Sequence, residues 1–334
     1  MTNPIIRQNI GIDISKASIS VCIAQKLLDQ SVLFPSSKSF ENTLSGFEKM
    51  NRWIQQFIDI TVEVHYTMEA TGVYYESLAY WLFENQKPVS VILAKQFKSY
   101  AQSLNIQSKT DGIDARILAQ MGVERKLSLW SAVSGQMRQL KQLSRERNSL
   151  MDEQTAIKNQ LHALKHSYQP DQRSIGRIEG RLALIAQQIK EIQEEMSEIL
   201  ANDPALKERI ANVCTIKGVS LITAIAIIAE TNGFALFHSR SQLVAYAGYD
   251  VVRRQSGTSI NAPTKISKKG NKHIRKTLYF PALSAAMHEP AMKKTYQRIT
   301  EKTNIKMKGA VAIQRRLLVL IYTLFKNNQP YDPN

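Results

Sequence analysis

The sequence has 334 residues, of which 43% are hydrophobic and 22% charged, a composition typical of a folded protein with room for two or three domains. The formal net charge of +16 is unusual, and nearly all of it lies in the last third. Residues 205–334 carry 21 basic and 6 acidic side chains, against 13 and 12 in residues 1–130 and 10 and 10 in residues 131–204. We therefore expect one region that binds a polyanion, joined to two regions that do not.

Three classes of protein are disfavoured by the rest of the composition. Cys22 and Cys214 are far apart and form no CxxC pattern, which argues against a disulfide framework or a structural zinc site. The longest apolar run, residues 219–229, is too short to span a bilayer, and the first residues show no signal-peptide pattern. The basic third has no long amphipathic helix with an aromatic-rich apolar face, which favours nucleic acid over a membrane surface. A cytoplasmic protein without a membrane partner is predicted.

Residues 1–130 alternate between strand-like and helix-like patterns. Buried and alternating runs predict strands at 9–14, 19–24, 62–68 and 89–93, with a further strand at 38–40. Helical spacing predicts helices at 43–57 and 74–83, and another that has Thr110 as its N-cap and continues through Ile117, Leu118 and Met121. This order indicates a mixed sheet with helices on both faces.

Four acidic residues fall at the ends of these elements. Asp13 lies in the first strand, Glu69 ends the strand at 62–68, and Asp111 and Asp114 share one face at the start of a helix. Four carboxylates that meet at one place repel each other unless a divalent cation lies between them. Oxygen ligands of this kind suit Mg²⁺ or Mn²⁺, and the usual use of such a site is phosphoryl transfer on a nucleic acid.

Residues 131–204 carry a heptad-like pattern. Leucine and isoleucine recur at spacings of three and four from Leu140 to Leu164, interrupted by Arg147 and Gln154. After a turn at residues 168–171 the pattern continues unbroken from 178 to 199. It predicts two long helices in an antiparallel coiled-coil hairpin. Such an arm either mediates oligomerisation or only spaces the parts on either side of it.

Residues 205–334 are predicted to be mainly helical, with two short helices between 210 and 229 and another at 241–247. The turn at 217–220 could offer backbone amides to a DNA phosphate, although a plain helical hairpin in a core is the more frequent reason for such a pattern.

From residue 251 to residue 288 there is no acidic side chain. A solvated face would mix signs, so this stretch is predicted to contact nucleic acid. The candidate contacts are Arg253, Arg254, Lys265, Lys268, Lys269, Lys272, Arg275 and Lys276. Ser256 stands among them on a predicted loop. Composition alone leaves open whether its hydroxyl attacks a phosphate or only contacts one.

Five sequence blocks, in order, resemble the DEDD recombinases of the one-ten family of insertion sequences, relatives of the Piv DNA invertases. The blocks are GIDISK at 11–16, EATGVY at 69–74, TDGIDAR at 110–116, AYAGYDVVRRQSGTS at 245–259 and SKKGNKHIRKTLY at 267–279. The resemblance covers nearly the whole chain. It departs from the family pattern at residues 217–220, where relatives often have Pro-Gly-Val/Ile-Gly, and at 248–251, where they often have Gly-Leu-x-Pro.

This resemblance implies a RuvC-like ribonuclease H fold in residues 1–130, a coiled-coil arm in 131–204 and a serine transposase domain in 205–334. It implies that Asp13, Glu69, Asp111 and Asp114 are catalytic and hold Mg²⁺ or Mn²⁺, and that Ser256 attacks DNA to form a covalent phosphoserine. It further implies a prokaryotic, nucleoid-associated transposase that acts as a dimer or tetramer on donor and target DNA. Members of the family also use a structured non-coding bridge RNA that pairs with both DNAs.

Other functions fit parts of the pattern. A structure-specific DNA endonuclease could use the same four acids with water as the nucleophile, and would not need Ser256. An ATPase of the actin-like branch also opens with a strand carrying Asp, but it needs a second glycine-rich phosphate loop that this sequence lacks. A non-catalytic nucleic-acid-binding protein leaves unexplained why the acids fall at strand ends and a helix start.

Overall fold

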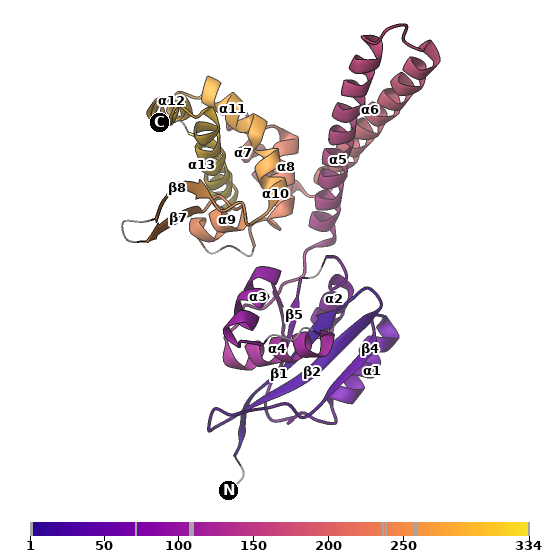
Figure 1. Ribbon diagram of the computed structural model, residues 1–334, viewed down its shortest axis with the longest axis vertical. Coiled ribbons are helices and arrows are strands. Elements are labelled where there is room, and N and C mark those ends of the chain that lie inside the picture. The colour runs from indigo at the N-terminus through magenta and orange to yellow at the C-terminus, as the bar shows by residue number, and fades with distance from the viewer. Residues whose placement is uncertain are drawn as a thin grey trace. The chain divides into compact units, whose positions relative to one another are not determined.

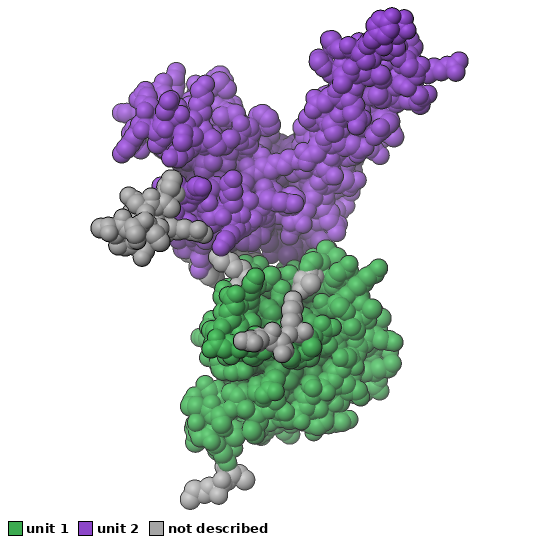
Figure 2. Space-filling model, in the orientation of Figure 1, with its two compact units in different colours: residues 1–132 green, residues 133–334 purple. Residues whose placement is uncertain are grey.

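The computed structural model describes residues 3–70, 72–106, 110–235, 237, 239–256 and 260–332, with the backbone alone for Lys95, residues 253–256 and residues 260–263. Of the five sequence blocks, Thr71 and residues 257–259 lie outside this set. The chain divides into two compact units, Met1–Ala132 (unit 1) and Val133–Asn334 (unit 2), coloured separately in Figure 2. The predicted helical arm therefore belongs to the same unit as the C-terminal region.

Unit 1 is built on a six-stranded mixed sheet of order β3-β2-β1-β5-β6, in which β4 also pairs with β2 (Figure 1). β1 runs antiparallel to β2 and parallel to β5, and β5 runs parallel to β6. The strands are β1 (Ile5–Ile14), β2 (Ser18–Leu27), β3 (Val32–Leu33), β4 (Ser37–Glu41), β5 (Val64–Glu69) and β6 (Val89–Ile92). The predicted mixed sheet is confirmed; β3, only two residues long, was not predicted.

Helices cover both faces of this sheet, as the sequence predicted. They are α1 (Leu44–Ile54), α2 (Glu76–Glu84), α3 (Ala94–Ser103) and α4 (Asp111–Glu124). The face of β1 that carries Ile10 and Ile12 packs against Phe47 and Met50 of α1 in one core. The opposite face of β1 packs against α4 at Gly11. The strand thus separates an apolar face under α1 from the face that carries Asp13.

Gly11 is a position at which the backbone of α4 lies very close to the sheet. A Cβ atom built on Gly11 would overlap Ala115 O and Ala119 N and would stand 2.7 Å from Ala119 Cα. These are backbone atoms of a buried helix turn, so they cannot give way by a simple change of rotamer. The absence of a side chain at Gly11 therefore lets α4 lie directly on β1.

We expect Gly11→Ala to lower the free energy of unfolding of unit 1 by about 3 kcal/mol, the upper end of the usual cost of overpacking, because the whole helix must move. Urea unfolding followed by tryptophan fluorescence measures unit 1, since Trp53, Trp81 and Trp130 all lie in it. Gly112→Ala is the matched control on α4: a Cβ there meets nothing within 4 Å, and its unfolding midpoint should stay the same or rise. Equal midpoints for the two variants would contradict the close packing of α4 on β1.

Unit 2 begins with two long helices, α5 (Gly135–Lys165) and α6 (Gln172–Ala201), as predicted. They run antiparallel: Lys165 pairs with Glu179 at 2.7 Å near the connection, and Gln139 donates to Glu195 at 2.9 Å at the other end. Asp171 caps α6 by accepting hydrogen bonds from the backbone of Arg173 and Ser174. The supercoiling of the two helices around each other, which a coiled coil requires, remains a prediction.

The remainder of unit 2 is mostly helical, which the sequence predicted. Its elements are α7 (Pro204–Cys214), α8 (Leu221–Glu230), α9 (Arg240–Tyr246), β7 (Val251–Ser256), β8 (Ile260–Ile266), α10 (Lys272–Thr277), α11 (Tyr279–His288), α12 (Pro290–Thr303) and α13 (Lys306–Asn327). The predicted short helices correspond to α7, α8 and α9. The antiparallel hairpin of β7 and β8 was not predicted.

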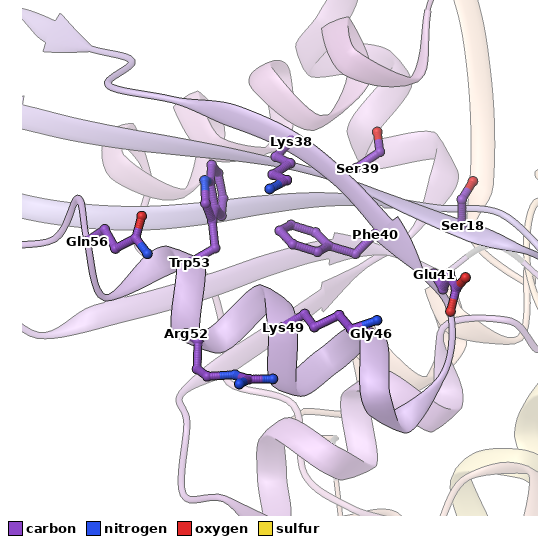
Figure 3. Close-up of a pocket in the computed structure, with 10 residues that line it drawn as sticks. All are labelled: Ser18, Lys38, Ser39, Phe40, Glu41, Gly46, Lys49, Arg52, Trp53 and Gln56. Carbon is purple, nitrogen blue, oxygen red and sulfur yellow. The ribbon is translucent and has the colours of Figure 1, made fainter.

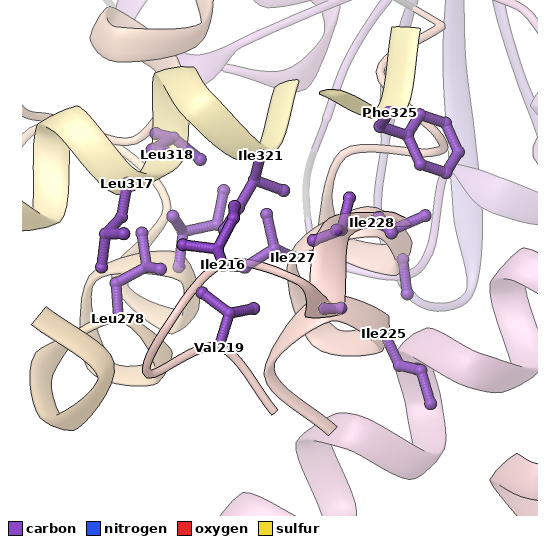
Figure 4. Packing of buried hydrophobic residues seen from close by; sticks show 14 of the residues in the cluster. Ile216, Val219, Ile225, Ile227, Ile228, Leu278, Leu317, Leu318, Ile321 and Phe325 are labelled. Atoms are coloured by element: carbon purple, nitrogen blue, oxygen red, sulfur yellow. The ribbon is translucent and has the colours of Figure 1, made fainter. Parts of the chain in front are cut away.

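The core of unit 2 is organised around α8. Eight of its residues, from Thr223 to Glu230, are buried, so this helix is apolar on all sides and needs neighbours all round. Figure 4 shows Ile227 of α8 in a cluster of side chains that includes Leu317 and Ile321 of α13. The apolar run in the sequence is thus the central helix of a globular core. No helix in the described ranges is long and apolar enough to cross a membrane.

Candidate functional site

The four predicted acids of unit 1 are brought together by the packing of α4 on the sheet. β1 and β5 are parallel, with Ile12 opposite Met68, so that Asp13 and Glu69 end neighbouring strands at the same edge. On α4, Ala115 and Ala119 lie over Gly11, while Gly122 lies against Asn9. The helix therefore runs antiparallel to β1, and its first turn, with Asp111 and Asp114, reaches the end of β1 that carries Asp13.

The start of α4 has the local structure that the sequence predicted. Thr110 has an extended backbone, and its hydroxyl accepts a hydrogen bond from Ile113 N at 3.3 Å. Asp111 is exposed, and Asp114 is half-buried on the same helix face. Carboxylates in the first turn are favoured by the partial positive charge of the helix N-terminus, which partly offsets their mutual repulsion.

The electrostatics of Asp13 show that the acids share one environment. Burial, the charge of Asp114, the charge of Asp111 and the charge of Glu69 together raise the pKa of Asp13 from 3.8 to about 6, against a lowering by the backbone N–H of Ile14. Within the described residues, no three His, Cys, Asp or Glu side chains already stand at metal-coordinating separation. The carboxylate of Asp13 thus lies within the electrostatic influence of the other three acids, without the closed coordination shell of a bound metal.

A divalent cation is the partner that this donor set fits. Burial is the largest cause of the raised pKa of half-buried Asp13, and the charges of three neighbouring carboxylates add to it. Oxygen donors without sulfur or imidazole suit Mg²⁺ or Mn²⁺ rather than a softer metal. The residues that would hold the ion are Asp13, Glu69, Asp111 and Asp114.

The basic stretch of unit 2 lies on and after the hairpin of β7 and β8. Ser256 is the last residue of β7 and pairs with Ile260, whereas the sequence predicted a loop at this position. Residues 251–256 have no alternating apolar pattern, so the sequence offered no reason to predict a strand there. The side chains of Arg253, Arg254 and Ser256 are outside the described set, as are residues 257–259.

The other predicted nucleic-acid contacts fall into two groups. Lys265, Lys268, Lys269 and Lys272 are exposed. Arg275 is half-buried, and its Nη1 donates to Ala247 O at 2.7 Å, while the amino group of Lys276 contacts the carboxylate of Asp152 on α5. The four exposed lysines carry positive charge at the surface. Arg275 and Lys276 instead make contacts that stabilise the fold.

A buried carboxylate that the sequence analysis did not single out fixes this basic stretch to the core. Glu230 ends α8, and its side chain is only 2% exposed. Its carboxylate accepts hydrogen bonds from Arg145 Nε at 2.6 Å and from Arg145 Nη2 at 3.0 Å. Asn271, the N-cap of α10, donates to the same carboxylate at 2.7 Å. Burial alone would raise the pKa of Glu230, but the hydrogen bonds from Arg145 and Asn271 and the charge of Arg145 lower it below 4.5. The arm helix α5, the central helix α8 and the basic helix α10 therefore meet at one ion pair.

We expect Arg145→Met to lower the free energy of unfolding of unit 2 by about 3 kcal/mol, because a buried carboxylate loses its partner while half-exposed Arg145 had kept part of its own hydration. The pH dependence should also change sign. In the parent chain the lowered pKa of Glu230 contributes stability above pH 4.5 that is lost as the pH falls. In the variant burial raises that pKa, so stability is lost as the pH rises from 4.5 towards neutrality.

Urea unfolding followed by the helical circular dichroism signal at several pH values measures this effect. Arg177→Met is the control, because Arg177 pairs with Asp171 at 3.8 Å between two exposed side chains and should contribute about 0–1 kcal/mol. The same pH slope in Arg145→Met and in the parent chain would show that Glu230 is not held ionised by Arg145.

Comparisons with known proteins identify the family of this chain. The profile of a DEDD transposase family of IS110 elements, described as Transposase, matches residues 10–170, and that of the Transposase IS116/IS110/IS902 family matches residues 210–297. The pilin gene-inverting proteins of Moraxella bovis and Moraxella lacunata are each 29% identical over 328 residues, covering 97% of this chain and 97% of each relative.

Solved structures give weaker likenesses. Thermus thermophilus RuvC in complex with a Holliday junction substrate is 10% identical, covers 37% of this chain and 99% of that chain, and has a TM-score of 0.28. A PPX-GPPA enzyme of Aquifex aeolicus is 13% identical, covers 58% of this chain and 94% of that chain, and has a TM-score of 0.22. TM-scores this low carry no argument. The assignment rests instead on the two matching family profiles and on the relatives that match over 97% of their length. This chain belongs to the IS110 family of transposases, enzymes that cut and rejoin DNA.

Proposed function

We propose that this transposase cuts DNA with a serine nucleophile and uses a divalent cation held by four carboxylates. The observation that carries the proposal is the convergence of Asp111, Asp114 and Glu69 on half-buried Asp13, in a chain whose excess positive charge lies in its other unit. In this proposal the fold of unit 1 is RuvC-like. Residues 1–130, 131–204 and 205–334 act as catalytic domain, arm and serine domain.

The four carboxylates have one task in this mechanism, which is to hold Mg²⁺ or Mn²⁺. The bound cation would supply electrostatic stabilisation of the charge on a phosphate. Asp13 and Glu69 sit on rigid strand ends, and Asp111 and Asp114 on a capped helix turn packed against the sheet, so this cage is built on regular elements rather than on loops. Such a site keeps its shape as DNA binds and leaves.

Ser256 has the second task. Its Oγ attacks the phosphorus of the scissile phosphodiester, and the bond to the 3′ oxygen breaks, giving a phosphoserine and a free 3′ hydroxyl. After strand exchange a 3′ hydroxyl attacks the phosphoserine, and the serine leaves with its proton restored. The number of phosphodiester bonds is unchanged, so no outside energy is needed. Arg253, Arg254 and the exposed lysines Lys265, Lys268, Lys269 and Lys272 stabilise charge on the phosphate, and Arg275 and Lys276 hold the DNA-facing segment in place.

Donor and target DNA are the substrates in this proposal, and a bridge RNA that pairs with both selects the sites. The chain acts as a dimer or tetramer, in which the acids of one subunit work with the serine of another. Family membership supports these partners, and so does the balance of 21 basic to 6 acidic residues in positions 205–334, which suits a polyanion.

The chemistry of the cleaved DNA end tests the proposal against a nuclease that uses water. The purified chain is incubated with labelled donor and target DNA, Mg²⁺ and RNA from the host that carries the element, and the products are separated under denaturing conditions. A serine nucleophile leaves protein on one DNA end, so that the labelled band shifts after protease digestion. Cleaved DNA that never carries protein would instead establish the water-dependent endonuclease.

A further inference from the structure

A groove on the edge of the sheet in unit 1 is separate from the four acids. It lies between β4 and α1 and has a volume of about 830 Å³ (Figure 3). α1 packs on the face of β1 that carries Ile10 and Ile12, whereas the acids lie on the face under α4. Because the two features occupy opposite faces of the sheet, the groove needs an explanation of its own.

The shape of the groove follows from the contact between helix and strand at one end. A Cβ atom on Gly46 would stand 2.9 Å from the backbone carbon of Glu41, so only glycine lets the start of α1 touch the end of β4. Further along, the two elements separate, and two aromatic rings, those of Phe40 and Trp53, lie between them with centroids 5.5 Å apart. The groove is thus closed at the Gly46 end and has an aromatic floor.

Cations stand on both walls of this groove. Lys38 comes from β4, and Lys49 and Arg52 come from α1, and all three are exposed. None of them forms an ion pair with a carboxylate of the described residues, and Glu41 is the one acid among the lining residues. Residues 1–130 carry 13 basic and 12 acidic side chains, so this cluster is a local concentration of charge in a balanced region.

The positive charge and the aromatic floor are combined at one point. The amino group of Lys38 lies 5.7 Å from the centroid of the Phe40 ring, and Phe40 is itself only half-buried. Exposed cations beside an accessible ring suit a ligand that carries phosphates and a flat base. A base that is still stacked in a duplex could not reach a ring at the floor of a groove. A lysine on edge strand β4 also disfavours the alternative occupant, a peptide strand added to the sheet.

We propose that this groove binds a single-stranded segment of nucleic acid, with phosphates between the cations of the two walls and a base against Phe40. The site is a second nucleic-acid contact of the transposase, on the unit that has almost no net charge. It does not depend on the identity of the nucleophile, so the serine mechanism and this site can fail independently. Single-stranded RNA and single-stranded DNA share the chemistry that the groove recognises.

The first test compares two triple variants of the full chain with equal loss of charge. One is Lys38→Gln, Lys49→Gln and Arg52→Gln; the control is Lys87→Gln, Lys98→Gln and Lys126→Gln, which removes cations of unit 1 outside the groove. Affinity for labelled RNA, single-stranded DNA and duplex DNA is measured over a range of salt concentrations. For single strands, the plot of log affinity against log salt has a negative slope. Its magnitude should decrease by about 2 in the groove variant, at about 0.7 for each lost phosphate contact, and should stay unchanged in the control.

Phe40→Leu examines the aromatic contact separately. It keeps an apolar side chain between strand and helix, and it should weaken single-strand binding by about fivefold or more while leaving duplex binding unchanged. Urea unfolding of the same variant, followed by tryptophan fluorescence, separates lost stacking from lost stability.

A crosslink locates the nucleic acid on the protein. Gln56→Cys, at an exposed residue that lines the groove beside Trp53, is made in a chain that also carries Cys214→Ser, labelled with a benzophenone and irradiated with each labelled oligonucleotide. Cys22 stays in place because it is buried. The label should crosslink to single strands in the parent background and lose that crosslink when the three groove cations are removed. RNA as the preferred partner would indicate the guide, and DNA would indicate an opened strand. Crosslinking to duplex DNA alone, or an unchanged salt slope in the groove variant, would overturn the proposal.

Discussion

Replacing Asp111 by asparagine is expected to lower DNA cleavage by about 10²–10³-fold, which corresponds to about 3–4 kcal/mol of lost transition-state stabilisation. The exposed carboxylate of Asp111 contributes to the field that raises the pKa of Asp13, and it stands on the helix turn that faces the end of β1. Without the charge of Asp111, the remaining carboxylates bind a divalent cation less tightly. The side chain keeps its size, so the start of α4 should be unchanged.

The same substitution should raise the stability of the metal-free protein. Carboxylates that repel one another cost free energy in the folded state, and the amide removes one of them from beside Asp13. Mg²⁺ or Mn²⁺ should therefore raise the Tm of the parent chain by more than it raises the Tm of Asp111→Asn. Loss of activity together with a gain of metal-free stability indicates a functional cluster. Replacing an acid that only stabilises the fold would lower both the stability and the activity of the protein.

Asp29→Asn is the control for this prediction. Asp29 is an exposed carboxylate of unit 1 whose oxygen accepts hydrogen bonds from the backbone and the hydroxyl of Ser31, and these bonds lower its pKa. Its loss should leave cleavage and the effect of metal on Tm unchanged. If Asp111→Asn cleaves DNA at the parent rate, or responds to metal as the parent does, Asp111 takes no part in holding a cation.

The sequence predicted the architecture around Asp13 because each part of it has a local signal. Asp13 is set in a run of isoleucines, Glu69 ends an apolar run, and Thr110 precedes a helical pattern. Parallel strands place their ends at one edge of a sheet, so the meeting of Asp13 and Glu69 needed only the strand order. Gly11 carries no such signal. Its role depends on how closely α4 approaches the strand, which only the packed structure shows.

Unit 2 contains contacts and elements that the sequence patterns did not predict. Glu230 and Arg145 are 85 residues apart, and Asn271 is 41 residues beyond Glu230, so no periodicity links them. One signal was present: Glu230 ends the most apolar helix of the chain, and an acid in such a place is rarely left without a cation. The hairpin of β7 and β8 had none, because its apolar and polar residues do not alternate along either strand.

Removing the hydroxyl of Ser256 is expected to abolish the covalent protein–DNA product, with any residual adduct at least about 10³-fold below the parent, because alanine offers no nucleophile. Binding of DNA should be unchanged, since the positive charges of the basic stretch remain. Ser256→Cys keeps a nucleophilic atom at the same place and should retain a small, measurable amount of adduct. Denaturing gels of labelled DNA before and after protease digestion measure both.

Ser259→Ala is the matched control, because it removes another hydroxyl from the same Ser-Gly-Thr-Ser segment and should leave the adduct in place. The pair of variants separates a nucleophile from a phosphate contact: a contact residue lowers affinity and changes the salt dependence, while a nucleophile changes only the covalent step. An adduct that survives Ser256→Ala but disappears in Ser259→Ala would transfer the nucleophile to the second serine. Survival in both variants would mean that the attacking atom lies outside this segment, and the four carboxylates of unit 1 would then be best explained by the activation of water.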